Sequence, residues 1–96
     1  MKNLEKNLNQ KENYKLIISE RAKKEMRKLP VSEIKKIDTQ LLRLKMDPYF
    51  PGVKKLSGST KTYRFRQGNY RVVYEVESQI RVVMIMAVGH RREVYS

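Results

Sequence analysis

Six arginines follow Thr62 in the chain, and several of them alternate with aromatic or aliphatic residues. Because successive side chains of a β-strand point to opposite faces of a sheet, Arg64 and Arg66 are expected on one face, with Tyr63 and Phe65 on the other. A sheet face with several fixed cations predicts a phosphate group as the ligand. The runs that carry the pattern are Tyr63-Arg64-Phe65-Arg66, Gly68-Asn69-Tyr70-Arg71 and Val88-Gly89-His90-Arg91-Arg92.

Cleavage of a phosphodiester without a metal requires an aligned hydroxyl, stabilisation of the negative charge that develops on the phosphoryl oxygens, and a proton for the leaving oxygen. Arginine meets the second requirement, because its guanidinium stays charged and its forked donors match phosphate oxygens. On RNA, the neighbouring 2′-OH can serve as the nucleophile. The arginines that we expect to clamp one phosphate are Arg64, Arg66, Arg71 and Arg91.

Each arginine also has a structural alternative. Arg71 and Arg81 could form ion pairs with the glutamates of residues 70–77 or with the loop. Arg64 and Arg66 could protect an edge strand, as charged residues often do. Edge protection does not explain the arginines at the start of the second strand and after the last strand, so the clamp is the stronger interpretation.

Other side chains could add to this chemistry. His90 is the sole histidine, and its titration range suits acid–base catalysis near neutral pH, although a lone histidine at a strand end is more often structural. Tyr95 could stack on a base, donate a proton or simply pack. The tyrosines at 63, 70 and 74 have inward strand spacing and are predicted to lie in the core. Candidate RNA contacts, which could equally be solvated, are Lys54, Lys55, Lys61 and Arg92.

The composition excludes several kinds of site. The absence of cysteine removes disulfides, thiolate catalysis and cysteine-ligated zinc, and one histidine cannot build a histidine-based metal site. We therefore expect neither a metal nor a cofactor. The formal net charge of +12 favours a polyanionic partner, either nucleic acid or an acidic protein. A lysine-rich surface that only aids solubility is the alternative.

The length of 96 residues fits one small domain. Residues 1–13 are polar and read as a tail or a frayed helix, and residues 14–96 are expected to form the domain. No run approaches the roughly 20 apolar residues of a membrane span, and the N-terminus does not resemble a signal peptide. These features predict a soluble cytoplasmic protein.

The elements that would position the arginines follow from local patterns. Residues 14–18 are β-prone, and Ser19 then offers an N-cap for a helix that runs to about Leu29 before Pro30. Apolar residues spaced 3, 4 and 3 apart predict a second helix, which Asp47-Pro48 ends. The prolines, glycines and lysines of residues 48–61 predict a loop with little regular structure.

Three strands are predicted after this loop, over residues 62–66, 70–77 and 80–88. Hairpin-length separations make them antiparallel neighbours. In the last strand, strict alternation would place Val82, Met84, Met86 and Val88 on one face, and apolar residues on both faces indicate a central strand. The order β-α-α-β-β-β predicts an α+β fold, with a helical hairpin packed on a small, mainly antiparallel sheet.

The chain from Tyr14 to Tyr95 resembles the RelE group of the RelE/ParE toxins. The motifs are individually weak, but their order is fairly specific. They are Glu20-Arg21-Ala22, Lys28-Leu29-Pro30, Asp47-Pro48, Lys55-Leu56-Ser57-Gly58, Gly68-Asn69-Tyr70-Arg71-Val72-Val73-Tyr74 and Val88-Gly89-His90-Arg91-Arg92-Glu93-Val94-Tyr95.

This resemblance implies a RelE-like fold and a ribosome-dependent endoribonuclease that cuts messenger RNA in the ribosomal A site. Attack by the 2′-OH would leave a 2′,3′-cyclic phosphate and a 5′-hydroxyl. The partners implied are the ribosome, messenger RNA and an acidic, RelB-like antitoxin that neutralises the toxin. The resemblance assigns Arg64, Arg66, Arg71 and Arg91 to cationic or phosphate-contacting positions, and Tyr95 to substrate orientation.

The chain departs from the best-known members at two points. Those members usually have lysines at positions 64 and 66, and one of these lysines is a candidate general base. Arginine does not deprotonate at neutral pH, so the proton acceptor is sought among His90, Glu93 and Tyr95. The spacing from Arg91 to Tyr95 is also shorter here. The alternatives are a ParE-like inhibitor of DNA gyrase and an inactive module of the same fold that binds nucleic acid or antitoxin.

Overall fold

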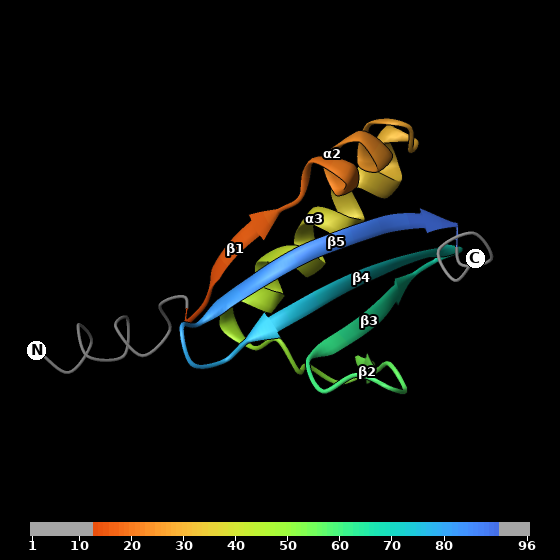
Figure 1. Ribbon diagram of the computed structural model, residues 1–96. Helices are drawn as coiled ribbons and strands as arrows, with labels where there is room; N and C mark the ends of the chain where they lie inside the picture. The colour runs from red at the N-terminus through yellow and green to blue at the C-terminus, as the bar shows by residue number, and fades with distance from the viewer. Residues whose placement is uncertain (1–12, 91–96) are drawn as a thin grey trace, which may run out of the picture.

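The structure is a computed structural model that describes residues 13–90 of the chain. Figure 1 shows a twisted sheet whose central strands run side by side, with α3 crossing one face and α2 lying beside β5. The elements in chain order are β1 (Lys15–Ile18), α2 (Glu20–Arg27), α3 (Val31–Met46), β2 (Lys54–Lys55), β3 (Thr62–Gln67), β4 (Tyr70–Glu77) and β5 (Val82–His90).

Helix α2 begins where the sequence predicts it. The Ser19 hydroxyl accepts a hydrogen bond from the Ala22 backbone N–H at 3.1 Å, which satisfies one of the free donors of the first turn. Ala22 and Met26 are buried against the sheet, whereas the other side of the helix is basic. The helix ends at Arg27, two residues before the predicted end, and Lys28 is its C-cap.

Helix α3 starts after Pro30, which has no side-chain capping bond. Its buried face is formed by Ile37, Leu41 and Leu44, and burial of each such side chain stabilises the fold by about 1.5–3 kcal/mol. Asp47 then adopts extended backbone geometry, as expected for a residue before proline. Among residues 13–90, neither helix is both long and apolar enough to cross a membrane.

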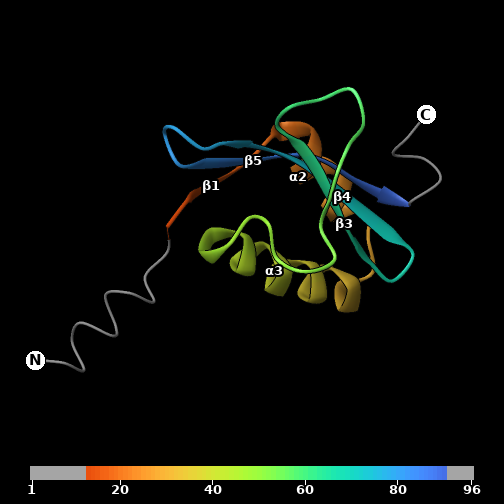
Figure 2. The same cartoon turned by 90° about the horizontal axis from the view of Figure 1, so that it is seen from below.

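The strands described by the structure form one mixed sheet in the order β1-β5-β4-β3-β2. β1 runs parallel to β5, and the other neighbouring pairs are antiparallel. Two helices on this sheet confirm the predicted α+β class and the helical hairpin. Figure 2 shows α3 on one side of the sheet, while the loop before β3 rises on the other side.

Two expectations about strand boundaries are wrong. Residues 48–61 are not entirely irregular, because Lys54 and Lys55 form the short strand β2 against β3. The last strand begins at Val82 rather than Ile80. Ile80 is 71% exposed, and Arg81 has a φ of 55°, a left-handed conformation that places it in the turn before the strand.

A β-bulge changes the faces of β5. Tyr74 of β4 pairs with Ile85, whereas the preceding residue Val73 pairs with Ala87, so Met86 is the extra residue on β5. Ile85 and Val88 are consequently both in the core cluster. The expectation of strict alternation, with Val88 on the face of Met84 and Met86, is therefore wrong beyond the bulge.

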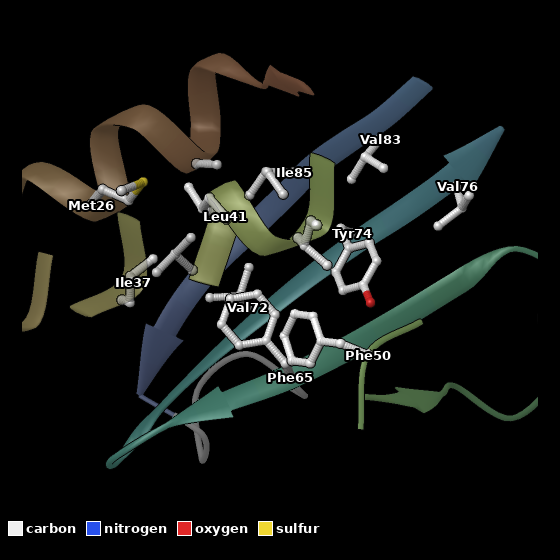
Figure 3. Close-up of a cluster of buried hydrophobic side chains, with 13 residues drawn as sticks. Met26, Ile37, Leu41, Phe50, Phe65, Val72, Tyr74, Val76, Val83 and Ile85 are labelled. Carbon is white, nitrogen blue, oxygen red and sulfur yellow. The ribbon is translucent and has the colours of Figure 1, made fainter. Parts of the chain in front are cut away.

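The core lies between α3 and the sheet, with α2 closing one side (Figure 3). Phe50 and Phe65 pack with their ring centres 5.7 Å apart, which ties the loop after α3 to β3. Tyr74 is fully buried and donates its hydroxyl hydrogen to the Pro48 carbonyl at 2.6 Å. The other two tyrosines predicted for the core, Tyr63 and Tyr70, are partly buried and pack against this cluster.

Candidate phosphate-binding site

The register of β3 and β4 brings three arginines to one face of the sheet. Phe65 pairs with Val72, and both side chains belong to the core under α3. Because strand side chains alternate, the residues on either side of this pair point to the opposite face. Those residues include Arg64, Arg66 and Arg71, and we refer to these three as the arginine cluster.

The arginine cluster concentrates positive charge that a sheet would otherwise avoid. Arg66 and Arg71 are direct partners in the β3–β4 ladder, and like charges in that position destabilise a sheet. Arg64 is 8% exposed and Arg71 is 3% exposed, so both guanidiniums are largely removed from water. An anion bound beside Arg66 and Arg71 would offset the repulsion between them through charge-assisted hydrogen bonds.

Strand β2 extends the cationic surface. Lys54 is the direct partner of Arg64, whereas Lys55 is the partner of Tyr63, whose side chain lies on the core face. Alternation therefore places Lys54, and not Lys55, on the face of the arginine cluster. β2 also covers β3 at Arg64, so edge protection does not explain this buried residue. Arg66 lies beyond the two residues that β2 covers, and it is exposed.

The turn between β3 and β4 holds Arg66 and Arg71 close together. Gly68 has a φ of 59°, a conformation that costs a residue with a Cβ, so glycine suits this turn. The Gln40 amide of α3 donates a hydrogen bond to the Gln67 side-chain oxygen at 3.4 Å. A Cβ at Gly68 would lie 3.4 Å from a Glu33 carboxylate oxygen. Helix α3 thus supports the turn directly.

His90 lies apart from the arginine cluster. It pairs with Tyr70, and the two rings contact each other edge to face with their centres 6.2 Å apart. Tyr70 packs against the core, so His90 shares the helix face of the sheet. Its strand neighbour Gly89 is the partner of Arg71 on the other face. This placement does not favour His90 as a base for a phosphate held by the arginines.

Lys61 is engaged within the molecule. Its ammonium group donates a hydrogen bond to the Glu77 carboxylate and lies 4.0 Å from Glu75. The hydrogen bond and the charge of Glu77 raise the pKa of Lys61. The two glutamates suggested as partners for Arg71 or Arg81 thus contact Lys61. Arg81 lies over the Tyr14 ring at 5.2 Å.

The remaining candidates lie outside the described residues, so the structure gives no account of Arg91, Arg92, Glu93 or Tyr95. A residue that the sequence patterns did not single out is Glu25, whose carboxylate accepts a hydrogen bond from the Val88 N–H of β5 at 2.8 Å. The only signal for it in the sequence is an acidic residue on an otherwise basic helix face.

Comparison with known proteins decides the family. The model of the ParE toxin of the type II toxin–antitoxin system parDE matches residues 16–95. This chain belongs to the RelE/ParE toxin family. A protein named toxin RelE1 from Methanocaldococcus jannaschii is 32% identical over 85 residues, which cover 85% of this chain and 94% of that protein.

Solved RelE structures have the same fold. The isolated Escherichia coli RelE toxin is 34% identical, with a TM-score of 0.73, over 85% of this chain and 90% of that chain. The RelE–RelB complex of Pyrococcus horikoshii OT3 gives 27% identity and a TM-score of 0.76, over 84% of this chain and 98% of that chain. The described β-α-α-β-β-β-β order is therefore a RelE/ParE toxin architecture, and the arginine cluster lies on its sheet.

Proposed function

We propose that this protein is the toxin of a type II toxin–antitoxin system and cleaves messenger RNA in the ribosomal A site. The observation that carries the proposal is the direct pairing of Arg66 with Arg71 on a sheet face that also holds the buried Arg64. Arginines fixed in this way can contact the non-bridging oxygens of one phosphate. The similarity to RelE toxins supports RNA as the source of that phosphate.

The proposed reaction is a transesterification within messenger RNA that the ribosome holds in place. The 2′-oxygen attacks the adjacent phosphorus, a new P–O2′ bond forms, and the P–O5′ bond breaks. The products are a 2′,3′-cyclic phosphate and a 5′-hydroxyl. The arginine cluster stabilises the negative charge that grows on the phosphoryl oxygens during this step, which is the interaction that lowers the barrier.

Two protons must also move, from the 2′-OH to a base and from an acid to the leaving 5′-oxygen. The guanidiniums do not supply the base, because arginine stays protonated at neutral pH. His90 lies on the other face of the sheet. We therefore assign the proton transfers to the segment after β5, where Glu93 and Tyr95 are the candidates, with Arg91 as a further phosphate contact and Arg92 as an RNA contact.

The proposed partners follow from charge and from the relatives. RelE proteins have been solved in complex with RelB antitoxins, in Escherichia coli and in Pyrococcus horikoshii OT3. An acidic antitoxin would complement the net charge of +12 on this chain. The same charge favours association with ribosomal and messenger RNA. A toxin that acts on ribosomes would work in the cytoplasm.

Primer extension on a translated messenger tests this proposal. The purified protein should produce cuts that are in phase with the codons when ribosomes are present, and none on the same RNA without ribosomes. The fragments should carry a 2′,3′-cyclic phosphate and a 5′-hydroxyl. Arg27→Ala, an exposed cation on α2, serves as a control that removes one charge outside the arginine cluster. Absence of codon-phased cuts by the wild-type protein would refute the proposal.

A ParE-like inhibitor of DNA gyrase is the second candidate, because the matching family model carries the ParE name. Inhibition of gyrase does not require a phosphate clamp on the sheet, so this candidate leaves the Arg66–Arg71 pair unexplained. Gyrase-linked DNA breaks without RNA cleavage would favour it. Binding of antitoxin or nucleic acid without either activity would indicate an inactive module of the same fold.

A further inference from the structure

The end of β5 that lies next to the arginine cluster lacks a strand on one side. β1 pairs with β5 only from Val82 to Ile85, and within residues 13–90 no strand continues along that edge. Gly89, the partner of Arg71, lies in this second half of β5. Backbone groups at an open strand edge need other partners, and without them a strand end opens easily.

Helix α2 supplies those partners. The Ser19 N–H donates to the Ile85 carbonyl at 3.0 Å, and the Ser19 hydroxyl donates to the Met86 carbonyl at 3.2 Å. Within α2, the Glu25 carboxylate accepts a hydrogen bond from the Val88 N–H at 2.8 Å. A side chain of α2 thus replaces β1 beyond Ile85, as the position of α2 beside β5 in Figure 1 illustrates.

The hydrogen bond between Glu25 and Val88 is short, and the carboxylate that accepts it is held in place by a second residue. A charged acceptor gives a shorter and stronger hydrogen bond than a neutral one, and the 2.8 Å distance agrees with that. The second carboxylate oxygen is held at 3.1 Å by the Arg21 guanidinium, which fixes the orientation of the group. The bond falls two residues after the extra residue Met86, where the bulge interrupts the β4–β5 ladder.

We propose that Glu25 is a positioning residue for the arginine cluster. By holding Val88, it fixes the end of β5 beside β4, and therefore the backbone on which Arg71 lies opposite Arg66. Glu25 lies on the α2 side of β5, where its carboxylate contacts Val88 and Arg21. The proposal rests on the proposed RNA cleavage, because it explains how the phosphate site of that reaction keeps its shape.

The test compares three variants of the full chain. Glu25→Ala removes the acceptor, Glu25→Gln keeps an oxygen for the Val88 N–H, and Glu20→Ala removes an exposed glutamate of the same helix that pairs only with Lys23 in the described contacts. Amide hydrogen exchange reports the bond itself. We expect Val88 exchange to accelerate about tenfold or more in Glu25→Ala alone, while Val76, whose β5 partner Val83 is covered by β1, changes little.

Ribosome-dependent cleavage reports the consequence for the site. Glu25→Ala should lower kcat about tenfold to a hundredfold with little change in KM, the size expected when an outer residue that orients a reacting group is lost. Glu25→Gln should recover most of the rate. If Glu25 had only a structural role, the cleavage rates of both Glu25 variants would fall in proportion to their loss of thermal stability. That result would overturn the proposal.

A third readout separates this proposal from the proposed function. Inorganic phosphate titrated into the protein should shift the side-chain Nε–H NMR signals of Arg64, Arg66 and Arg71, and Glu25→Ala should weaken this binding several-fold relative to Glu20→Ala. If the wild-type protein binds phosphate but cuts no RNA, the proposed function fails. The role of Glu25 is then still decided by the phosphate affinity of Glu25→Ala relative to that of Glu20→Ala. Equal phosphate affinity in both variants, with unchanged Val88 exchange, would refute the role of Glu25.

Discussion

At the scale of single residues, the arginines on β3 and β4 favour phosphate binding over proton transfer. Arg66 and Arg71 face each other in the ladder, where like charges repel and a bound anion would offset the repulsion. A guanidinium binds a phosphate through two donors in fixed geometry, whereas a lysine offers one point charge. The residues are therefore better suited to hold a phosphate through its transition state than to exchange protons with it.

Replacement of Arg71 by lysine separates charge from geometry. Arg71→Lys keeps the positive charge but loses the forked donors, so we expect the cleavage rate on ribosomes to fall about a hundredfold, the lower end of the range seen when one preorganised donor is removed. Single-turnover cleavage of a ribosome-bound messenger measures this. A rate equal to that of the wild-type protein would show that charge alone is sufficient at position 71.

Tyr74 gives a stability prediction at the same scale. Tyr74→Phe leaves the buried Pro48 carbonyl without its 2.6 Å hydrogen bond, which should cost about 1–2 kcal/mol in the free energy of unfolding. Urea denaturation of the two proteins measures the difference. If the two unfolding midpoints coincide, this hydrogen bond adds nothing to stability.

The same tyrosine also predicts a pH dependence. Burial, followed by the charges of nearby tyrosines and Asp47, raises the pKa of Tyr74 above its value in the unfolded chain. The folded state therefore keeps the proton longer, so this contribution to stability is fully present below about pH 10 and is lost as the pH rises above that value. Denaturation curves between pH 8 and pH 11 should show a smaller alkaline loss in Tyr74→Phe, and parallel losses would contradict the assignment.

At the scale of elements, the local patterns predicted the helices and strands because their causes are local. Ser19 caps α2, apolar spacing defines α3, and hairpin-length separations define β3, β4 and the turns around them. The bulge at Met86 and the two-residue strand β2 were not predicted, because both depend on the register between neighbouring strands, which the pattern of a single strand does not determine. The role of Glu25 was not predicted either, because its partner Val88 is 63 residues away in the chain.

The link between α2 and β5 can be tested at its first contact. Ser19→Ala removes both the cap of α2 and the hydrogen bond to the Met86 carbonyl, so we expect a loss of about 1–2 kcal/mol in the free energy of unfolding. Ser78→Ala, an exposed serine in the β4–β5 turn, is the matched control and should change stability little. Equal stabilities of the two variants would mean that the Ser19 contacts are not stabilising.

At the scale of the whole molecule, the sequence predicted that Arg64, Arg66, Arg71 and Arg91 would hold a phosphate, but not how these residues pair across the strands. Alternation alone placed Arg64 and Arg66 together, and only the β3–β4 register added Arg71 as a direct partner. The register also places Lys54, but not Lys55, on the face of the arginine cluster, and it places His90 on the opposite face. Charge was a weak guide to individual residues, because Lys61 is positive and yet contacts two glutamates.

Salt dependence follows from the size of the cationic face. A single-stranded RNA with one phosphate in the arginine cluster and a second phosphate at Lys54 would make about two phosphate contacts, which predicts a slope of about −1.4 for log K against log salt concentration. Fluorescence anisotropy with a labelled oligoribonucleotide measures it. The double variant Arg66→Ala/Arg71→Ala should reduce the slope by about 0.7, the value expected for the loss of one phosphate contact, and an unchanged slope would place the RNA elsewhere.

The most direct test of the phosphate clamp is the single-turnover rate at which ribosome-bound messenger RNA is cut by Arg66→Ala, by Arg71→Ala and by the control Arg27→Ala. Each cluster variant should lower the rate by about a hundredfold or more, because each removes stabilisation of the transition-state charge, whereas the control should cut at the wild-type rate. Thermal unfolding checks that each of the three proteins is folded at the assay temperature. Wild-type rates in both cluster variants would contradict the assignment of this sheet face as the site of RNA cleavage.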